Sequence, residues 1–165
     1  MRKLTVVVLC LLVAASVAMA QTKIDTKWTC SKPSENPKFD AGDAPGHSYG
    51  LAKGTCDATS GSSGEKSGAY AEIQEAWKTS MKTHGTFTVT MDNGDMVYYT
   101  YDITGSPEAK KPLMNKWKIA NGTGKHKGAK GAGSCTGTLN ADQSSSWVCT
   151  GTVTMGGMAK EKAKE

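Results

Sequence analysis

A chain of 165 residues is long enough for one domain with its own core but not for two. Its net charge of +5 is a mild excess, and Arg2 is the only arginine, so the sequence lacks the clustered arginines of a nucleic-acid-binding face. With two Phe against 19 Gly, the core must rely on Trp, Tyr, Val, Met and Cys, and the abundance of Gly, Thr and Ser favours strands and turns over helices.

The first twenty residues have the parts of a cleavable signal peptide. Arg2 and Lys3 precede an apolar run over residues 4–17, and small residues stand at positions 18 and 20. This run is short for the roughly 30 Å of a bilayer's hydrocarbon core, so we expect cleavage after Ala20 and no membrane span in the mature chain. The protein is therefore predicted to be secreted or periplasmic, with a mature charge near +3 from 18 Lys against 15 Asp and Glu.

Four of the five cysteines follow the predicted cleavage site, and an even number in an exported chain predicts disulfides. They are Cys30, Cys56, Cys135 and Cys149. Zinc binding is the alternative, but the sequence has no C-x-x-C pair and its three His are scattered. We therefore expect two disulfides and neither a metal ion nor a cofactor.

The first part of the mature chain alternates strands with polar connections. Residues 23–30 have the period-two pattern of a half-buried strand, and residues 47–56 are a second strand candidate. Between them, residues 31–46 carry three Pro and are predicted to form a long loop, and residues 57–68 a Gly- and Ser-rich connection. The side chains expected on the buried face of the first strand are Ile24, Thr26, Trp28 and Cys30.

Residues 68–78 fit either a helix or a strand. Ile73 and Trp77 are four residues apart, as on one face of a helix, but Glu75 would share their face in a strand. The segment has no capping box and its neighbours are predicted strands, so we favour the strand. The sequence leaves open whether Glu72 and Glu75 face inward or outward.

The clearest unit is a hairpin over residues 83–103, in which two alternating segments flank Asn93-Gly94. This pair is preferred in two-residue type I′ turns, because both positions need positive φ. A turn of that type would place Met91 opposite Met96.

A second hairpin is predicted near the C-terminus, from residues 134–139 and 145–155, after a strand around Trp117 and a Gly- and Lys-rich link. A turn over residues 140–144 would put Cys135 opposite Cys149, close enough for a disulfide, with Trp147 covering Gly137. Cys30 and Cys56 are then left to pair, although a crossed pairing such as Cys30 with Cys149 stays open.

Seven or eight strands in sequential order without helical crossovers predict an all-β fold. We expect an antiparallel up-and-down β-barrel of about 8 strands, stapled by disulfides. The predicted organisation is a signal peptide over residues 1–20, a single barrel domain over 21–158, and a charged tail over 159–165 that has nothing to bury.

The segment from Trp117 to Gly131 reads W-x-I-x-x-G-T-G-K-x-x-G-A-x-G. It resembles a segment of the allene oxide cyclase and dirigent barrels, of the calycin-like superfamily, and of small exported bacterial proteins of unassigned activity. A fainter similarity to the bacterial group lies in residues 43–56. The resemblance implies a barrel, but His126 stands where the plant barrels favour an aromatic residue, and no catalytic constellation matches. The spacing is not that of a phosphate-binding loop; tight turns explain the glycines better than an anion-binding nest of backbone amides.

Aromatic residues and one histidine are the candidates for ligand binding. Four indoles are spread over the predicted strands and would either line a cavity or form the core. We predict an exported, non-catalytic protein that binds a small apolar or aromatic ligand or an envelope partner, without fixing its oligomeric state. The alternatives are an isomerase or cyclase using His47, Glu75 or Tyr98 as a polar group inside the barrel, and a structural or stress-related secreted protein. The candidate ligand-binding residues are Trp28, Trp77, Trp117, Trp147, Tyr98 and His47.

Overall fold

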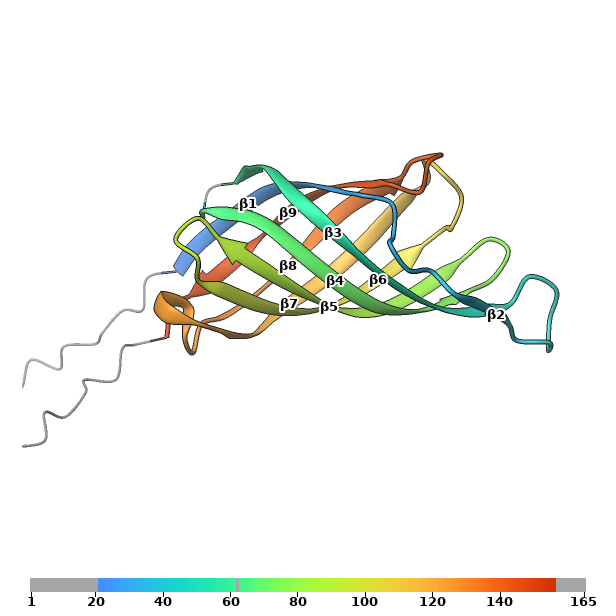
Figure 1. The fold of residues 1–165 in the computed structure, drawn as a ribbon, viewed down its shortest axis with the longest axis horizontal. Helices are drawn as coiled ribbons and strands as arrows, with labels where there is room; N and C mark the ends of the chain where they lie inside the picture. The colour runs from blue at the N-terminus through green and yellow to red at the C-terminus, as the bar shows by residue number, and fades with distance from the viewer. Residues whose placement is uncertain (1–20, 62, 157–165) are drawn as a thin grey trace, which may run out of the picture.

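The computed structural model describes residues 21–61 and 63–156; the predicted signal peptide and charged tail lie outside the described residues. The described chain forms a closed antiparallel β-barrel of eight strands with one short extra strand, β2 (Figure 1). Its strands are β1 (Gln21–Cys30), β2 (Lys38–Asp40), β3 (Ser48–Gly61), β4 (Glu65–Ala76), β5 (Met81–Met91), β6 (Met96–Gly105), β7 (Pro112–Gly122), β8 (Lys130–Leu139) and β9 (Ser145–Thr154). No helix in the described ranges is long and apolar enough to span a membrane.

Each strand follows its neighbour in the chain, and pairing of β1 with both β9 and β3 closes the barrel. The β1–β3 pairing is short and ends where Cys30 lies opposite Cys56. Beyond that point the chain continues along β3, where Ser34 N–H donates to the Lys53 carbonyl at 2.8 Å, until β2 pairs with the start of β3. The segment after β1 and strand β2 thereby cover the edge of β3 beyond its pairing with β1.

The two predicted disulfides are confirmed. Cys30 on β1 is bonded to Cys56 on β3, and Cys135 is bonded to Cys149 within the β8–β9 hairpin. The predicted register of that hairpin is also confirmed, with Gly137 opposite Trp147. Because the barrel closes between β1 and β3, the first disulfide joins strands that are not consecutive in the chain.

Aromatic side chains inside the barrel lie over glycines of neighbouring strands. A Cβ at Gly133 or Gly151 would collide with the indole of Trp117, and one at Gly137 would collide with that of Trp147. Large rings therefore fit inside a narrow barrel because their neighbours have no side chain.

The boundaries of two predicted segments are corrected. Most of the connection expected over residues 57–68 is strand, since β3 extends to Gly61 and β4 begins at Glu65. Pairing with β1 and with each other orders these polar strand ends, which composition alone would leave irregular. The loop expected over residues 31–46 contains β2. The strand expected over 68–78 is confirmed as part of β4, which ends at Ala76.

The register predicted for the β5–β6 hairpin is wrong by one residue, because Thr90, not Met91, lies opposite Met96. Gly94 has a φ of +83°, but Asn93 is not among the described non-glycine residues with positive φ. Met91 N–H donates to the Asp95 carbonyl and Gly94 N–H to the Met91 carbonyl, both at 2.9 Å. These bonds define a three-residue loop with a glycine bulge rather than a type I′ turn.

The Gly-rich link lies at one end of the barrel (Figure 1). A 3₁₀ turn, η1 (Gly124–His126), follows β7, and Ala129 after it is fully buried. The Asp95 carboxylate accepts the backbone N–H of Lys125 at 3.0 Å, and Thr123 Oγ1 accepts that of Met96 at 2.8 Å. The Asp95 carboxylate thus binds one of the backbone amides that an anion-binding nest would have used to bind a ligand.

Candidate functional site: the barrel lumen

A cavity of about 400 Å³ lies inside the barrel and reaches the end opposite η1. The lining includes Pro33, Pro107 and Ala141, from the segments that follow β1, β6 and β8. These segments lie toward the right-hand end of the barrel in Figure 1, and we call this end of the lumen the mouth. This volume falls in the range of pockets that hold one small molecule. An eight-stranded barrel is just wide enough for such a ligand.

Three of the six predicted ligand-binding residues line this cavity: Trp28, Trp117 and Trp147. The other three predicted residues, Trp77, Tyr98 and His47, are not among the lining residues. Tyr98 alternates with inward-facing neighbours along β6, and Trp77 follows the end of β4 and stacks on His47 outside the lumen. The four disulfide-bonded cysteines belong to the lining as well.

The aromatic residues of the lining contact one another inside the barrel. Trp28 and Phe87 meet edge to face, with ring centroids 5.0 Å apart. Since β1 and β5 are not neighbours, this contact crosses the lumen. Tyr99 and Trp117 make a second edge-to-face contact at 5.5 Å. The rings supply a largely apolar surface with specific contact geometry.

A carboxyl group on β4 is the main polar feature of the lumen. Glu72 Oε2 accepts a hydrogen bond from the Tyr101 hydroxyl, and Glu72 Oε1 accepts one from Gln74 Nε2 at 2.7 Å. Glu72, Gly85 and Tyr101 are consecutive partners across β4, β5 and β6. A Cβ on Gly85 would come within 2.5 Å of the Tyr101 ring, so the absence of a side chain there lets the ring reach across β5 to Glu72.

The surroundings of Glu72 favour its neutral form. Burial raises the pKa of Glu72 above its usual 4.5, although the hydrogen bonds from Tyr101 and Gln74 oppose this shift. Burial also raises the pKa of Tyr101, and it raises the pKa of Tyr70 to about 12. A carboxyl with a raised pKa in an apolar cavity is suited to exchanging a proton or to holding a ligand's donor group.

Several buried polar atoms of the lining have no hydrogen-bond partner in the structure: Thr26 Oγ1, Asn36 Oδ1, Glu65 Oε2 and Asn115 Oδ1. Buried polar atoms are normally paired, so each unpaired one calls for an explanation such as a ligand or water. These atoms come from β1, β4, β7 and the segment before β2. Unpaired polar atoms therefore occur on several walls of the barrel.

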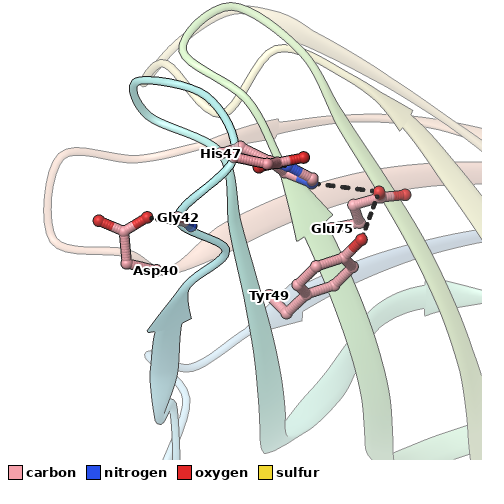
Figure 2. A network of polar contacts seen from close by, with 6 residues as sticks. Asp40, Gly42, His47, Tyr49 and Glu75 are labelled. Atoms are coloured by element: carbon pink, nitrogen blue, oxygen red, sulfur yellow. Dashed lines mark hydrogen bonds and ion pairs between the residues drawn. The ribbon is translucent and has the colours of Figure 1, made fainter.

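A second polar cluster lies on the outer wall of the barrel, where β3 begins and β4 ends. His47 Nδ1 is 2.6 Å from Asp43 Oδ1, and His47 Nε2 is 3.2 Å from Glu75 Oε1. The Tyr49 hydroxyl donates to the same Glu75 oxygen at 3.1 Å (Figure 2). The imidazole is buried and stacks on Trp77 at 4.8 Å between centroids.

Charge holds this outer cluster together. The hydrogen bond with Asp43 raises the pKa of His47 above 6.5, with a further contribution from Glu75, while burial opposes the shift. The same bond lowers the pKa of Asp43. Because both ring nitrogens face carboxylates, the protonated imidazolium can donate on both sides. The arrangement anchors the loop before β3 to the end of β4, outside the cavity.

The sequence did not single out Glu72 and Tyr101 as polar residues of the lumen. His47, Glu75 and Tyr98, its candidates for a polar group inside the barrel, all lie outside the cavity lining. One signal was available: an isolated glycine within a strand pattern, here Gly85, marks a close approach of another group.

No family model matches this chain, and no curated protein matches its sequence. Within the described ranges, no group of three or more His, Cys, Asp and Glu residues is placed to hold a metal ion.

Proposed function

We propose that this protein binds one small, largely apolar molecule inside its barrel, without transforming it, and that it does so as an exported protein. The observation that carries the proposal is the cavity of about 400 Å³, lined by Trp28, Trp117 and Trp147. The two disulfides support export, because such bonds persist in oxidising compartments.

The cavity favours a binder over a purely structural protein. A structural barrel would fill its interior with side chains, as eight-stranded barrels are able to do. Here the aromatic rings leave a cavity of about 400 Å³, and polar atoms of lining residues, such as Asn115 Oδ1, stay unpaired. Leaving both space and unpaired acceptors empty would cost stability with no compensating contact.

A titration with the neutral fluorophore N-phenyl-1-naphthylamine tests the proposal. Its emission rises on entering an apolar site, and we expect saturable binding at one site per chain. Ala76→Trp should weaken binding at least about tenfold, which corresponds to about 1.4 kcal/mol, because Ala76 lines the cavity near its mouth.

The matched control is Ala71→Trp, which adds the same ring to the exposed face of the same strand. It should leave the affinity unchanged. Absence of saturable binding by the wild-type protein, or equal weakening by both substitutions, would overturn the proposal.

A second candidate function is an isomerase or cyclase that positions a reactive molecule in the same lumen, as the similarity to allene oxide cyclases implies. The Glu72 carboxyl beside the Tyr101 hydroxyl favours it, since a buried carboxyl with a raised pKa is a suitable general acid or base. Native mass spectrometry of protein purified from the exported fraction distinguishes the two functions. A bound molecule recovered unchanged after incubation indicates a binder, whereas its recovery as an isomer that Glu72→Gln no longer forms indicates an enzyme.

A further inference from the structure

The unpaired polar atoms of the lumen are mainly acceptors. Asn36 Oδ1, Glu65 Oε2 and Asn115 Oδ1 are buried without a donor, and all three residues line the cavity. Glu72 adds a second carboxyl, whose oxygens already accept two bonds but have lone pairs left for more. A ligand that contacts the Glu72 carboxyl inside the cavity is favoured when it brings a hydrogen-bond donor.

The charges of the lining are also one-sided. Glu65 and Glu72 are its acidic residues, and Lys38 is the only basic one among the described residues that line the cavity. Lys38 lies on β2 at the mouth and is exposed to solvent. An anionic ligand would therefore meet two carboxyl groups inside the barrel without a compensating cation, which burial makes costly.

The rings of the lining favour the opposite charge. The faces of Trp and Tyr rings attract cations, and Trp28, Tyr99 and Trp117 all line the cavity. Aromatic walls combined with the Glu72 carboxyl form a site for a molecule whose apolar body carries a positively charged donor group.

We infer that the ligand class of this lumen is an organic amine, protonated at neutral pH, with an apolar or aromatic body. This inference rests on the proposed binding function and specifies its ligand. The ammonium group donates to the Glu72 carboxylate, and the apolar body lies against the aromatic rings. Placing the charge there offsets the cost of burying the Glu72 carboxylate.

Three probes with the same phenyl body test this inference: 2-phenylethylamine, 2-phenylethanol and 3-phenylpropanoate. Each is titrated calorimetrically into the full mature protein at pH 8, and each is also measured by displacement of N-phenyl-1-naphthylamine. We expect the amine to bind at least about tenfold more tightly than the alcohol, and the carboxylate to bind weakest. The advantage of the amine should decrease as the pH falls and Glu72 becomes protonated.

Two substitutions locate the effect. Glu72→Gln keeps the size of the side chain and an acceptor for Tyr101, so the amine-to-alcohol affinity ratio should fall toward one. Glu75→Gln changes the carboxyl on the outer face of the same strand and should leave the ratio as in the wild type. Circular dichroism of both variants establishes that the barrel is intact.

The outcomes separate the two proposals. If the fluorophore binds but the alcohol or carboxylate binds as tightly as the amine, the amine inference is overturned and the binding function stands. The inference is likewise overturned if folded Glu72→Gln keeps the full preference. If neither the fluorophore nor any phenyl probe binds, the proposed function itself fails.

Discussion

Glu72 and Glu75 lie three residues apart on β4 but belong to opposite sides of the barrel wall. Glu72 faces the lumen, where burial raises its pKa and its partners are the uncharged Tyr101 and Gln74. Glu75 faces outward, where it accepts hydrogen bonds from His47 and Tyr49.

The difference shows that one strand serves two purposes. The inner face of β4 places a carboxyl in an apolar space, where its charge is costly and available to a ligand. The outer face uses a carboxylate to fix the loop that precedes β3 through an ion pair with His47. Because successive side chains of a strand point to opposite faces, the two carboxyls lie on opposite sides of the barrel wall, and each can be altered separately.

The largest effect is expected from a side chain added at Gly85 on β5, which lies between Glu72 and Tyr101. Gly85→Val would place methyl groups where the Tyr101 ring and the Glu72 Cβ lie, at 2.5 and 2.9 Å from an added Cβ. We expect a loss of about 1–3 kcal/mol in the free energy of unfolding, measured by urea denaturation. Thr86→Val, on the exposed face one residue along, should change it by less than about 0.5 kcal/mol. Equal effects of the two changes would contradict the described packing.

The two carboxyls themselves should differ in how they affect the pH dependence of stability. A carboxyl whose pKa is raised by folding lowers stability as the pH rises from its unfolded value, 4.5 for Glu72, through its folded value. Glu72→Gln should therefore gain stability relative to the wild type as the pH rises from 4 to 8, with little difference at pH 4. Urea titrations at several pH values measure this gain.

Glu75→Gln is the control for that series, because it leaves the Glu72 carboxyl in place and should retain the wild-type decline linked to it. If the free energy of unfolding of Glu72→Gln changes with pH as that of the wild type does, burial does not disfavour the charged form of Glu72.

A smaller effect is expected on the outer face, with the opposite dependence on pH. The pKa of His47 is raised, so its contribution is complete below its unfolded value of 6.5 and disappears as the pH rises through the folded value. The lowered pKa of Asp43 removes the contribution again in acid, below its usual 3.8. His47→Gln should thus reduce the melting temperature more at pH 5.5 than at pH 9.

His84→Gln is the matched control for that change. His84 also faces a carboxylate, Asp102 at 2.9 Å, but both side chains of that pair are about two-thirds exposed, at 66% and 70%. Exposed ion pairs contribute little because water screens them. The two substitutions should differ clearly at pH 5.5, and a similar response would indicate that burial of His47 adds nothing.

The sequence by itself determined most of the barrel. The period-two pattern of residues 23–30 identified the first strand and its buried face, because alternation is a local property of the chain. The β8–β9 pairing and the expectation of two disulfides followed from strand spacing and cysteine number, whereas the structure decided against the crossed pairing of Cys30 with Cys149. The strand pattern depends on residues whose polarity differs sharply between the two faces. The disulfides depend on a bond that only cysteines form.

Only the tertiary structure decided which face of β4 is the inner one. Alternation places Glu72 with Tyr70 and Gln74, and Glu75 with Ile73 and Trp77, but both sets mix polar and apolar residues. The choice was made by pairing across the sheet, where Gly54 and Gly85 leave room for the rings of Tyr70 and Tyr101. The β5–β6 register was decided in the same way, since a one-residue shift reverses every side chain and the buried Val89, Val97 and Tyr101 must face inward together. Sidedness is a property of the closed barrel, because only closure gives a strand an inside.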